Sequence, residues 1–314
     1  MIRRIKLGLK LVVSRIFGAL GSRTVPPPTN SAVTLIAGRN LPVYIDKNLH
    51  PCFKQNRASI PYPVFVLTVP KSGTYLIAKL LDNLGVVDCG VHIATGFIQD
   101  NRFADEKVLK REAWRYHVPI PFKISTKLIK NGQFAFGHIP YYLEGEQMLH
   151  RFKKIFTFRE LRDIIISLVR YYDARQHNYA KPERIRLYNI FKEAPMGNPK
   201  FEAWYAMWGK EFADLIRNMF PWKDRGDVYC VKFETLMGDD GKEAQFAMLR
   251  GLGGFLGLDF TDDMIDKALS DAIGAETLTY SGKRSSYEDW WNDELEELFI
   301  RYGFKDLNGI YGYE

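Results

Sequence analysis

Residues 65–81 read FVLTVPKSGTYLIAKLL, two apolar segments joined by a turn that contains a lysine. Its first part, residues 65–69, is an apolar run with the length and the Val, Phe and Leu content of a buried strand. After a turn, leucine recurs at helical spacing, at Leu76, Leu80, Leu81 and Leu84. Gly85 then provides a typical helix end. The stretch therefore predicts a strand, a tight loop and a helix.

The loop has the composition of an anion-binding site. The first N–H groups of a helix lack intrahelical partners and lie at the positive end of its dipole. Lys71 adds a charge, and Ser72 and Thr74 add hydroxyl donors. The phosphate loop of nucleotide triphosphatases needs glycines where this chain has Phe65 and Pro70, so that motif is absent. An ordinary β–α turn with a hydroxyl cap and a surface lysine is the competing interpretation.

Three further apolar runs, residues 134–138, 154–158 and 228–233, are each followed by a turn and later by a helical pattern. Such alternation predicts an α/β fold: a single domain whose central parallel sheet is flanked by helices, with a P-loop-like strand–loop–helix. Ligands of these sheets bind beyond the carboxyl ends of the strands. This rule directs attention to the Lys71 loop and to the residues that follow the other three runs.

Two of those strand ends hold candidate site residues. In KIFTFRELRDIIISLVRYY, Arg159 follows a strand, where its guanidinium suits a phosphate, and Asp163 and Ser167 share one face of the helix that follows. In QFAFGHIPYY, His138 ends an apolar strand. A salt-bridged arginine and a structural histidine are the competing interpretations of each segment taken alone.

Composition sets broad limits on the chain. It has 314 residues, 46% of them hydrophobic, and a net charge of +7, which fits an anionic ligand, a membrane surface or nucleic acid equally. The three cysteines, Cys52, Cys89 and Cys230, form neither a disulfide framework nor a metal pattern, which favours a reducing, cytoplasmic compartment. No apolar run approaches the roughly 18 residues of a spanning helix.

The first residues differ from the rest of the chain. Residues 1–22 predict a basic amphipathic helix, and residues 1–20 are expected to lie on the inner face of an anionic membrane; a helix packed on its own domain and an organelle transit peptide are the alternatives. Lys10 and Arg15 interrupt the apolar core that a secretion signal requires. Residues 23–60 are expected to be a linker and N-terminal extension, and residues 61–314 the main domain.

Taken together, these motifs resemble those of the sulfotransferase family that uses 3′-phosphoadenosine 5′-phosphosulfate (PAPS). VPKSGTY resembles the family's 5′-phosphosulfate loop, PKSGTTW, and Arg159 and Ser167 keep the eight-residue spacing of its 3′-phosphate motif. GHIP resembles its histidine motif and lies 21 residues before Arg159. VYCVKFETL is similar to its later strand and turn, and SGKRSSYEDWWNDEL to its C-terminal loop. The likeness extends from about residue 62 to the end of the chain.

The resemblance implies an O-sulfotransferase with PAPS as co-substrate, 3′-phosphoadenosine 5′-phosphate (PAP) as product and no metal. His138 would be the general base, and Lys71 would act both in catalysis and in binding. The implied nucleotide-binding residues are Lys71, Ser72, Gly73, Thr74, Tyr75, Arg159, Ser167, Lys283 and Arg284.

Some positions depart from the family pattern. Tyr75 and Leu76 replace the second threonine and the tryptophan of the loop, and Phe136 stands where cytosolic members carry a lysine. The C-terminal loop reads Gly282, Lys283, Arg284 instead of R-K-G. These departures favour a bacterial-type or carbohydrate-directed branch.

The acceptor is therefore expected to be a hydroxyl of a saccharide or glycolipid. Aromatic residues in 88–130 and 171–208 suit sugar stacking but also suit a core. The alternatives are a small hydroxylated metabolite as acceptor, a divergent P-loop nucleotide or sugar kinase, and a non-catalytic protein that kept the fold. Nucleic acid is not expected as a partner, because aromatics are not interleaved with the N-terminal basic residues.

Overall fold

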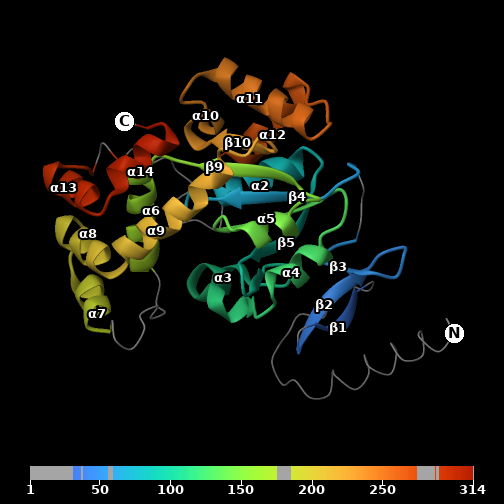
Figure 1. Ribbon diagram of the computed structural model, residues 1–314, viewed down its shortest axis with the longest axis horizontal. Helices are drawn as coiled ribbons and strands as arrows, with labels where there is room; N and C mark the ends of the chain where they lie inside the picture. The colour runs from blue at the N-terminus through green and yellow to red at the C-terminus, as the bar shows by residue number, and fades with distance from the viewer. Residues whose placement is uncertain are drawn as a thin grey trace.

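The computed structural model describes residues 31–36, 38–55, 59–174, 185–273, 287 and 290–313. A seven-stranded sheet with the order β10-β9-β4-β8-β5-β6-β7 forms its centre (Figure 1). The strands are β4 (Val64–Thr68), β5 (Val87–Ile93), β6 (Ile98–Asp100), β7 (His117–Val118), β8 (Gln133–Gly137), β9 (Lys153–Phe158) and β10 (Val228–Lys232).

The four apolar runs of the sequence form β4, β8, β9 and β10, which are parallel, and β4 is buried over its whole length between β8 and β9. The α/β prediction is therefore confirmed. Strand β5 extends the parallel part, whereas β6 and β7 pair antiparallel at the edge. Only residues 94–97 connect β5 to β6, and so short a connection allows only antiparallel pairing. These short edge strands carry too weak a pattern to be predicted.

Helices cover both faces of the sheet (Figure 1). Val64 and Val66 of β4 belong to an apolar cluster with α2, α11 and α12, while Phe65 and Leu67 belong to a second cluster with α6, α9, α13 and α14. Phe65 also meets the rings of Phe122 and Phe152 edge to face. The helices are α2 (Thr74–Asn83), α3 (Glu106–Glu112), α4 (Phe122–Ser125), α5 (Leu143–Met148), α6 (Leu161–Ala174), α7 (Ile185–Glu193), α8 (Asn198–Trp204), α9 (Lys210–Met219), α10 (Phe233–Met237), α11 (Lys242–Phe255), α12 (Asp262–Ala272), α13 (Asp293–Arg301) and α14 (Phe304–Tyr311).

Shorter turns complete the fold. They are 3₁₀ helices at Ala113–Tyr116, Thr126–Leu128 and Phe220–Trp222 and a π-helical turn at Tyr205–Gly209. Within the described ranges, no helix is both long and apolar enough to cross a membrane.

A small antiparallel sheet precedes the domain in the region expected to be a linker and extension. It consists of β1 (Ser31–Ile36), β2 (Arg39–Ile45) and β3 (Pro51–Cys52). Its buried residues Ile36, Leu41 and Val43 belong to the same apolar cluster as the face of the main sheet that carries Phe65. The predicted amphipathic helix at residues 1–22 lies outside the described residues.

We predict that Gly137→Ala destabilises the protein by about 2–4 kcal/mol. A methyl group on this last residue of β8 would lie 2.0 Å from the carbonyl oxygen of Ile93, a backbone atom of β5 that cannot rotate away. Urea unfolding checks this expectation. Gly254→Ala is the control, because nothing lies within 4 Å of its added carbon in α11. Equal stability of Gly137→Ala and wild type would contradict the close packing of β5 and β8.

Candidate functional site

The loop after β4 and the turn after β9 lie side by side at the carboxyl edge of the sheet. Thr68 of β4 stands opposite Thr157 of β9 in the parallel register. Lys71 follows Thr68 by three residues and Arg159 follows Thr157 by two. The pairing of these strands therefore brings two cations that are distant in sequence to one edge.

The loop backbone is held in an unusual conformation. Lys71 has φ 68°, and Gly73, the residue before α2, has φ 87°. A methyl group on Gly73 would lie 2.6 Å from Cδ2 of Phe233, the first residue of α10. Glycine is therefore required at position 73, because its φ angle is positive and because the ring of Phe233 leaves no space for a side chain. The residue before α2 is a glycine, so it makes no side-chain cap to the first N–H groups of this helix.

The two loop hydroxyls turn inward. Ser72 is buried, and its Oγ lies 2.7 Å from the carbonyl oxygen of Val69 and 3.0 Å from Oγ1 of Thr157, which ties the loop to β9. Thr74 is buried too and donates to Oγ1 of Thr68 at 3.1 Å. In this arrangement both hydroxyls hold the loop in shape.

His138 is positioned by the same threonine of β4. Its Nδ1 lies 2.7 Å from the carbonyl oxygen of Thr68 and 2.9 Å from the hydroxyl of Thr68. A carbonyl oxygen can only accept, so Nδ1 carries the proton, and Nε2 of the neutral ring has a lone pair. Thr74, Thr68 and His138 thus form one hydrogen-bonded series from loop to imidazole.

Aromatic rings surround His138. His92 of β5 meets its ring edge to face, with centroids 4.6 Å apart, and also contacts Phe136 at 5.4 Å. Tyr75 of α2 packs on Phe136 at 5.7 Å. Tyr75 and Phe136 are two of the positions that depart from the family pattern, and their contact makes them a single structural feature.

One face of α6 lies beside the loop. Lys71 places its ammonium 4.6 Å from the ring centroid of Tyr171, a cation–π contact. Ser167, which is half-buried, lies one turn before Tyr171, and Asp163 one turn before Ser167. The face of α6 therefore leads from the Arg159 turn to the Lys71 loop.

Arg159 is held by a carboxylate and a ring. Its Nη2 donates to Oδ2 of Asp163 at 2.9 Å, and its guanidinium carbon lies 4.3 Å from the ring centroid of Phe233. The residue is only 7% exposed. Because Phe233 also touches Gly73, its ring joins the Arg159 turn to the Lys71 loop.

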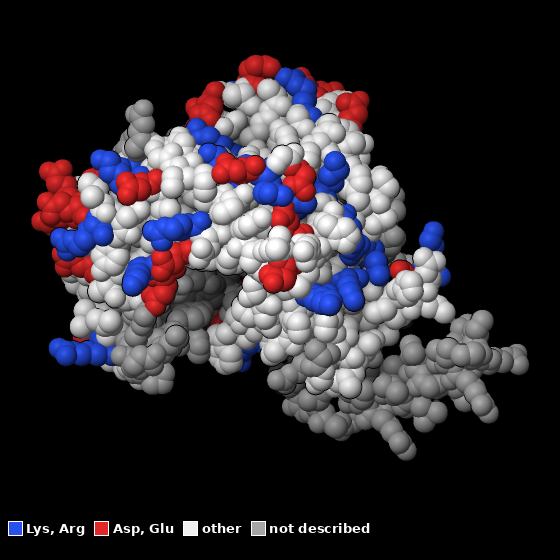
Figure 2. All heavy atoms as spheres, in the orientation of Figure 1, with Lys and Arg blue, Asp and Glu red and all other residues white. Residues whose placement is uncertain are grey.

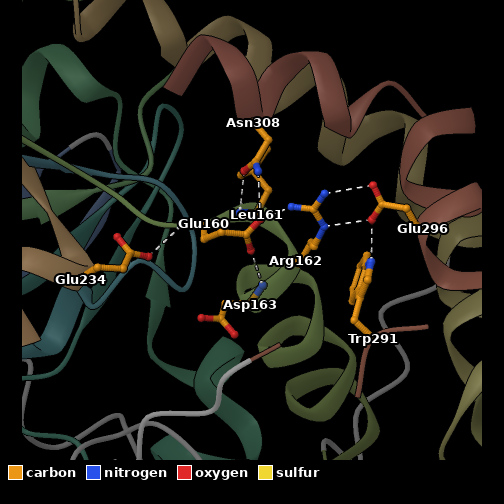
Figure 3. Close-up of polar contacts among 8 residues, drawn as sticks. All are labelled: Glu160, Leu161, Arg162, Asp163, Glu234, Trp291, Glu296 and Asn308. Carbon is orange, nitrogen blue, oxygen red and sulfur yellow. Dashed lines mark hydrogen bonds and ion pairs between the residues drawn. The ribbon is translucent and has the colours of Figure 1, made fainter. Parts of the chain in front are cut away.

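A buried polar network fixes the turn that contains Arg159 (Figure 3). The Glu160 carboxylate accepts from Nη1 of Arg162 at 2.8 Å, from Nδ2 of Asn308 at 2.9 Å and from the backbone N–H of Asp163 at 3.0 Å. Asn308 of α14 in turn accepts from the N–H of Leu161. The backbone N–H groups of Leu161 and Asp163, at the start of α6, therefore both have side-chain acceptors.

Segments from elsewhere in the chain complete this network. Arg162 binds Glu296 of α13 through two parallel hydrogen bonds of 2.9 Å, and Trp291 donates to the same carboxylate (Figure 3). Glu234 of α10 accepts from the N–H of Glu160 at 3.0 Å. The glutamate of the FETL stretch therefore holds the phosphate-motif turn.

Most of the predicted site residues lie at one edge of the sheet. Lys71, Ser72, Gly73, Thr74, Tyr75, His138, Arg159 and Ser167 gather at the carboxyl edge of β4, β8 and β9, whereas Lys283 and Arg284 lie outside the described residues. Thr68 and Phe233 also contribute to the site but were not predicted. Each follows an apolar strand pattern, and nothing in the neighbouring sequence indicates what it contacts. Within the described part of the chain, no three His, Cys, Asp or Glu side chains gather as a metal site would need.

A comparison with protein-family models supplies the remaining observation. The model described as "Sulfotransferase domain" matches residues 61–293. The chain belongs to the sulfotransferase family. The enzyme class expected from the motifs, a PAPS-dependent sulfotransferase, is thereby confirmed, although the branch of the family is not specified.

One solved structure shares the fold of this sulfotransferase, and a second is more distantly similar. The mouse sulfotransferase SULT7A1 complexed with PAP is 15% identical, with 82% of this chain and 90% of that chain covered and a TM-score of 0.50. A retinol dehydratase in complex with androsterone and inactive cofactor PAP is 14% identical, with 79% and 81% covered and a TM-score of 0.47. Among curated proteins, no sequence matches the chain.

The imidazoles of His138 and His92 in this sulfotransferase are kept neutral, mainly because they are buried. The pKa of His138 is lowered to about 4, mainly by burial and to a smaller extent by the charge of Lys71, while the hydrogen bond to the Thr68 carbonyl acts in the opposite direction. Burial also brings the pKa of His92 well below its ordinary value, with smaller contributions from His138 and His117. At neutral pH, His138 therefore offers an unprotonated Nε2.

We predict that acid weakens the fold through these histidines. His138 has a pKa of about 4 in the folded protein and about 6.5 in the unfolded chain. Between these two pH values the unfolded chain binds more protons than the folded protein. The free energy of unfolding therefore falls as the pH falls from about 6.5 to about 4. The contribution of His138 is on the order of 3 kcal/mol. Urea unfolding of the nucleotide-free protein across this range measures it.

His138→Asn should flatten this pH dependence, whereas His150→Gln, at an exposed histidine, should leave it unchanged. An equally steep fall in His138→Asn and wild type would show that other groups cause the acid sensitivity.

Proposed function

We propose that this sulfotransferase transfers the sulfuryl group of PAPS to a hydroxyl of a saccharide or glycolipid. The observation that supports this acceptor is two pairs of rings, Phe97 with His117 at the edge of the sheet and His92 with His138 farther inside. Phe97, 36% exposed, stacks on His117 with centroids 4.3 Å apart. His117 is near enough to His92 to affect its pKa, and His92 contacts His138.

Stacked, exposed rings suit the apolar face of a pyranose, and imidazoles suit its hydroxyls. Phe97 and His117 come from the hairpin of β6 and from β7, the edge strands of the sheet, so the acceptor would enter from that edge. Trp204, one of the other aromatic candidates, is fully buried and belongs to the core. The departures Tyr75 and Phe136 would form the wall behind the reacting hydroxyl.

The nucleotide would lie across the edge between β4 and β9. Lys71, the first N–H groups of α2 and the residues through Tyr75 would bind the 5′-phosphosulfate. Arg159 and Ser167 would bind the 3′-phosphate, because Asp163 and Phe233 hold the guanidinium at the carboxyl end of β9 and a guanidinium suits phosphate oxygens. Lys283 and Arg284 are proposed to add charge to the same phosphate.

The chemistry divides among these groups. PAPS supplies a sulfuryl group on a phosphate leaving group. His138 Nε2 takes the proton of the acceptor hydroxyl as the new O–S bond forms and the old S–O bond breaks. Lys71 and the α2 N–H groups stabilise the negative charge on the departing phosphate. Such transfer depends mainly on position and charge, as phosphoryl transfer does.

The proposed function includes a place in the cell where the enzyme acts. We infer a cytoplasmic enzyme that meets the inner face of an anionic membrane through residues 1–20, where basic and apolar residues recur at helical spacing. Such a position would suit a glycolipid acceptor.

Arg159→Ala tests the nucleotide site. We expect the dissociation constant for PAP to rise at least about tenfold, while that for adenosine 5′-phosphate stays unchanged, because the lost charge-assisted bonds go to the 3′-phosphate alone. Calorimetric titration measures both. Arg170→Ala, farther along α6 and stacked on Trp290, is the control. Equal losses for both nucleotides would remove Arg159 from the 3′-phosphate.

The acceptor is tested by transfer of radiolabelled sulfate from PAPS to glycans, glycolipids and small alcohols, with mass spectrometry of the products. We expect glycans or glycolipids to be labelled, Lys71→Ala to lose at least about a hundredfold in rate, and Phe97→Ala to raise KM for the saccharide with little change in kcat. Labelling of the small alcohols alone would reject the saccharide proposal and leave the sulfotransferase intact.

A further inference from the structure

The opposite edge of the sheet carries a group of cations that catalysis does not use. Exposed lysines of this face are Lys47 in the turn after β2, Lys54 after β3, Lys123 in α4 and Lys127 in the next turn. Figure 2 shows Lys and Arg gathered where α4 and the β2–β3 turn lie in Figure 1. We call this set, with Lys130 and Arg151, the amino-edge face.

Contacts show that the amino-edge face is continuous. Arg151 donates from Nη2 to the carbonyl oxygens of Thr126 and Ile129, at 2.8 and 2.7 Å, and so lies against the turn that holds Lys127. The ammonium of Lys130 lies 4.0 Å from Asp46 in the β2–β3 turn. The Asp46 carboxylate also accepts from the backbone N–H groups of that turn, so it offsets only part of the local charge.

An apolar side chain stands among these cations. Leu49 is 66% exposed at the tip of the β2–β3 turn, between Lys47 and His50. It has φ 65°, a conformation that leucine rarely adopts, and the hydrogen bonds of Asp46 hold the turn in that shape. Cations around a projecting leucine match a surface that is anionic outside and apolar beneath.

Most of the net positive charge of the chain lies in residues 1–30, which precede the amino-edge face in the sequence. Of the net charge of +7, six charges belong to residues 1–30, which hold six Lys or Arg and no Asp or Glu, so the rest of the chain carries only +1. Residues 1–30 join the described chain at Ser31, which pairs with Tyr44, two residues before Asp46. The strongly basic segment is therefore attached beside the amino-edge face.

We propose that the amino-edge face docks on an anionic lipid bilayer, with Leu49 inserted among the headgroups. This inference goes beyond the proposed function, because it assigns membrane contact to the folded domain in addition to residues 1–20. A bilayer is favoured over nucleic acid because Leu49 offers an apolar anchor and the neighbouring ring, Phe53, is buried and cannot stack on bases.

Docking in this way would direct the active edge away from the lipid. Lys71 and His138 lie beyond the carboxyl ends of β4 and β8, and five strand residues separate them from the amino edge, roughly 17 Å of strand. A glycolipid acceptor would therefore have to present a saccharide headgroup long enough to reach over the domain, whereas a soluble saccharide would reach the site directly.

Flotation of the full chain with vesicles tests the inference. The probes are phosphatidylcholine vesicles with and without about one third phosphatidylserine, a fraction at which each surface cation adds measurably to binding. We expect binding to the anionic vesicles only, weakened at least about tenfold in Lys123→Glu/Lys127→Glu. Lys210→Glu/Lys267→Glu, the same charge change on exposed lysines of α9 and α12, should bind within about twofold of wild type.

Two more full-length variants separate the contributions. Arg3→Gln/Arg4→Gln/Lys6→Gln/Lys10→Gln should weaken vesicle binding yet leave a remainder that Lys123→Glu/Lys127→Glu abolishes. Leu49→Asn, an exchange that the positive φ tolerates, should weaken binding to vesicles but not to nucleic acid. PAP titration of each variant reports on folding and on the nucleotide site independently, so a failed docking proposal leaves the sulfotransferase proposal standing.

Two results would overturn the inference. In one, both double lysine reversals bind anionic vesicles equally. In the other, the wild type binds a DNA duplex but no vesicle and loses that binding in Lys123→Glu/Lys127→Glu, which would make nucleic acid the partner of this face.

Discussion

The parallel pairing of β4 with β9 is the constraint on which the site depends. Because Thr68 and Thr157 are register partners, the loop after one strand and the turn after the other must emerge together. The hydroxyl of Ser72 reinforces that pairing by contacting Thr157, and the ring of Phe233 fills the space between Gly73 and Arg159. A shift of this register would separate the two cations that the nucleotide is proposed to bridge.

The proposed base, His138, shares this constraint. Thr68 holds the imidazole of His138 through its carbonyl oxygen and accepts a hydrogen bond from the hydroxyl of Thr74, so one residue of β4 positions both the proposed base and the proposed phosphosulfate loop. Buried rings keep that imidazole neutral. Phe136 stands where cytosolic members carry a lysine and packs between Tyr75 and His92, so an apolar wall takes the place of a charge beside the proposed position of the acceptor hydroxyl.

The two edges of the sheet have different proposed functions, binding of the donor at the carboxyl edge and contact with lipid at the amino edge. The carboxyl edge gathers Lys71, Arg159 and His138, and the network around Glu160 holds that edge against α13 and α14. The amino edge gathers exposed lysines around Leu49 beside the attachment point of the basic segment. Because a strand has two ends, recognition of an anionic donor and of an anionic surface need not compete for the same residues.

The parallel core and the strand–loop–helix around Lys71 could be predicted from the amino-acid sequence. Short continuous apolar runs followed by turns and helical patterns are typical of buried strands between two helical layers, and the order of the motifs indicated the family, so β4, β8, β9 and β10 were predictable. The sequence could not supply the edge strands β5 to β7, whose short and mixed patterns lack a clear period. Nor could it supply the roles of Thr68, Phe233 and Glu234, or the contact between Tyr75 and Phe136. Those depend on register and on packing between segments distant in the chain, and only the tertiary structure brings such residues together.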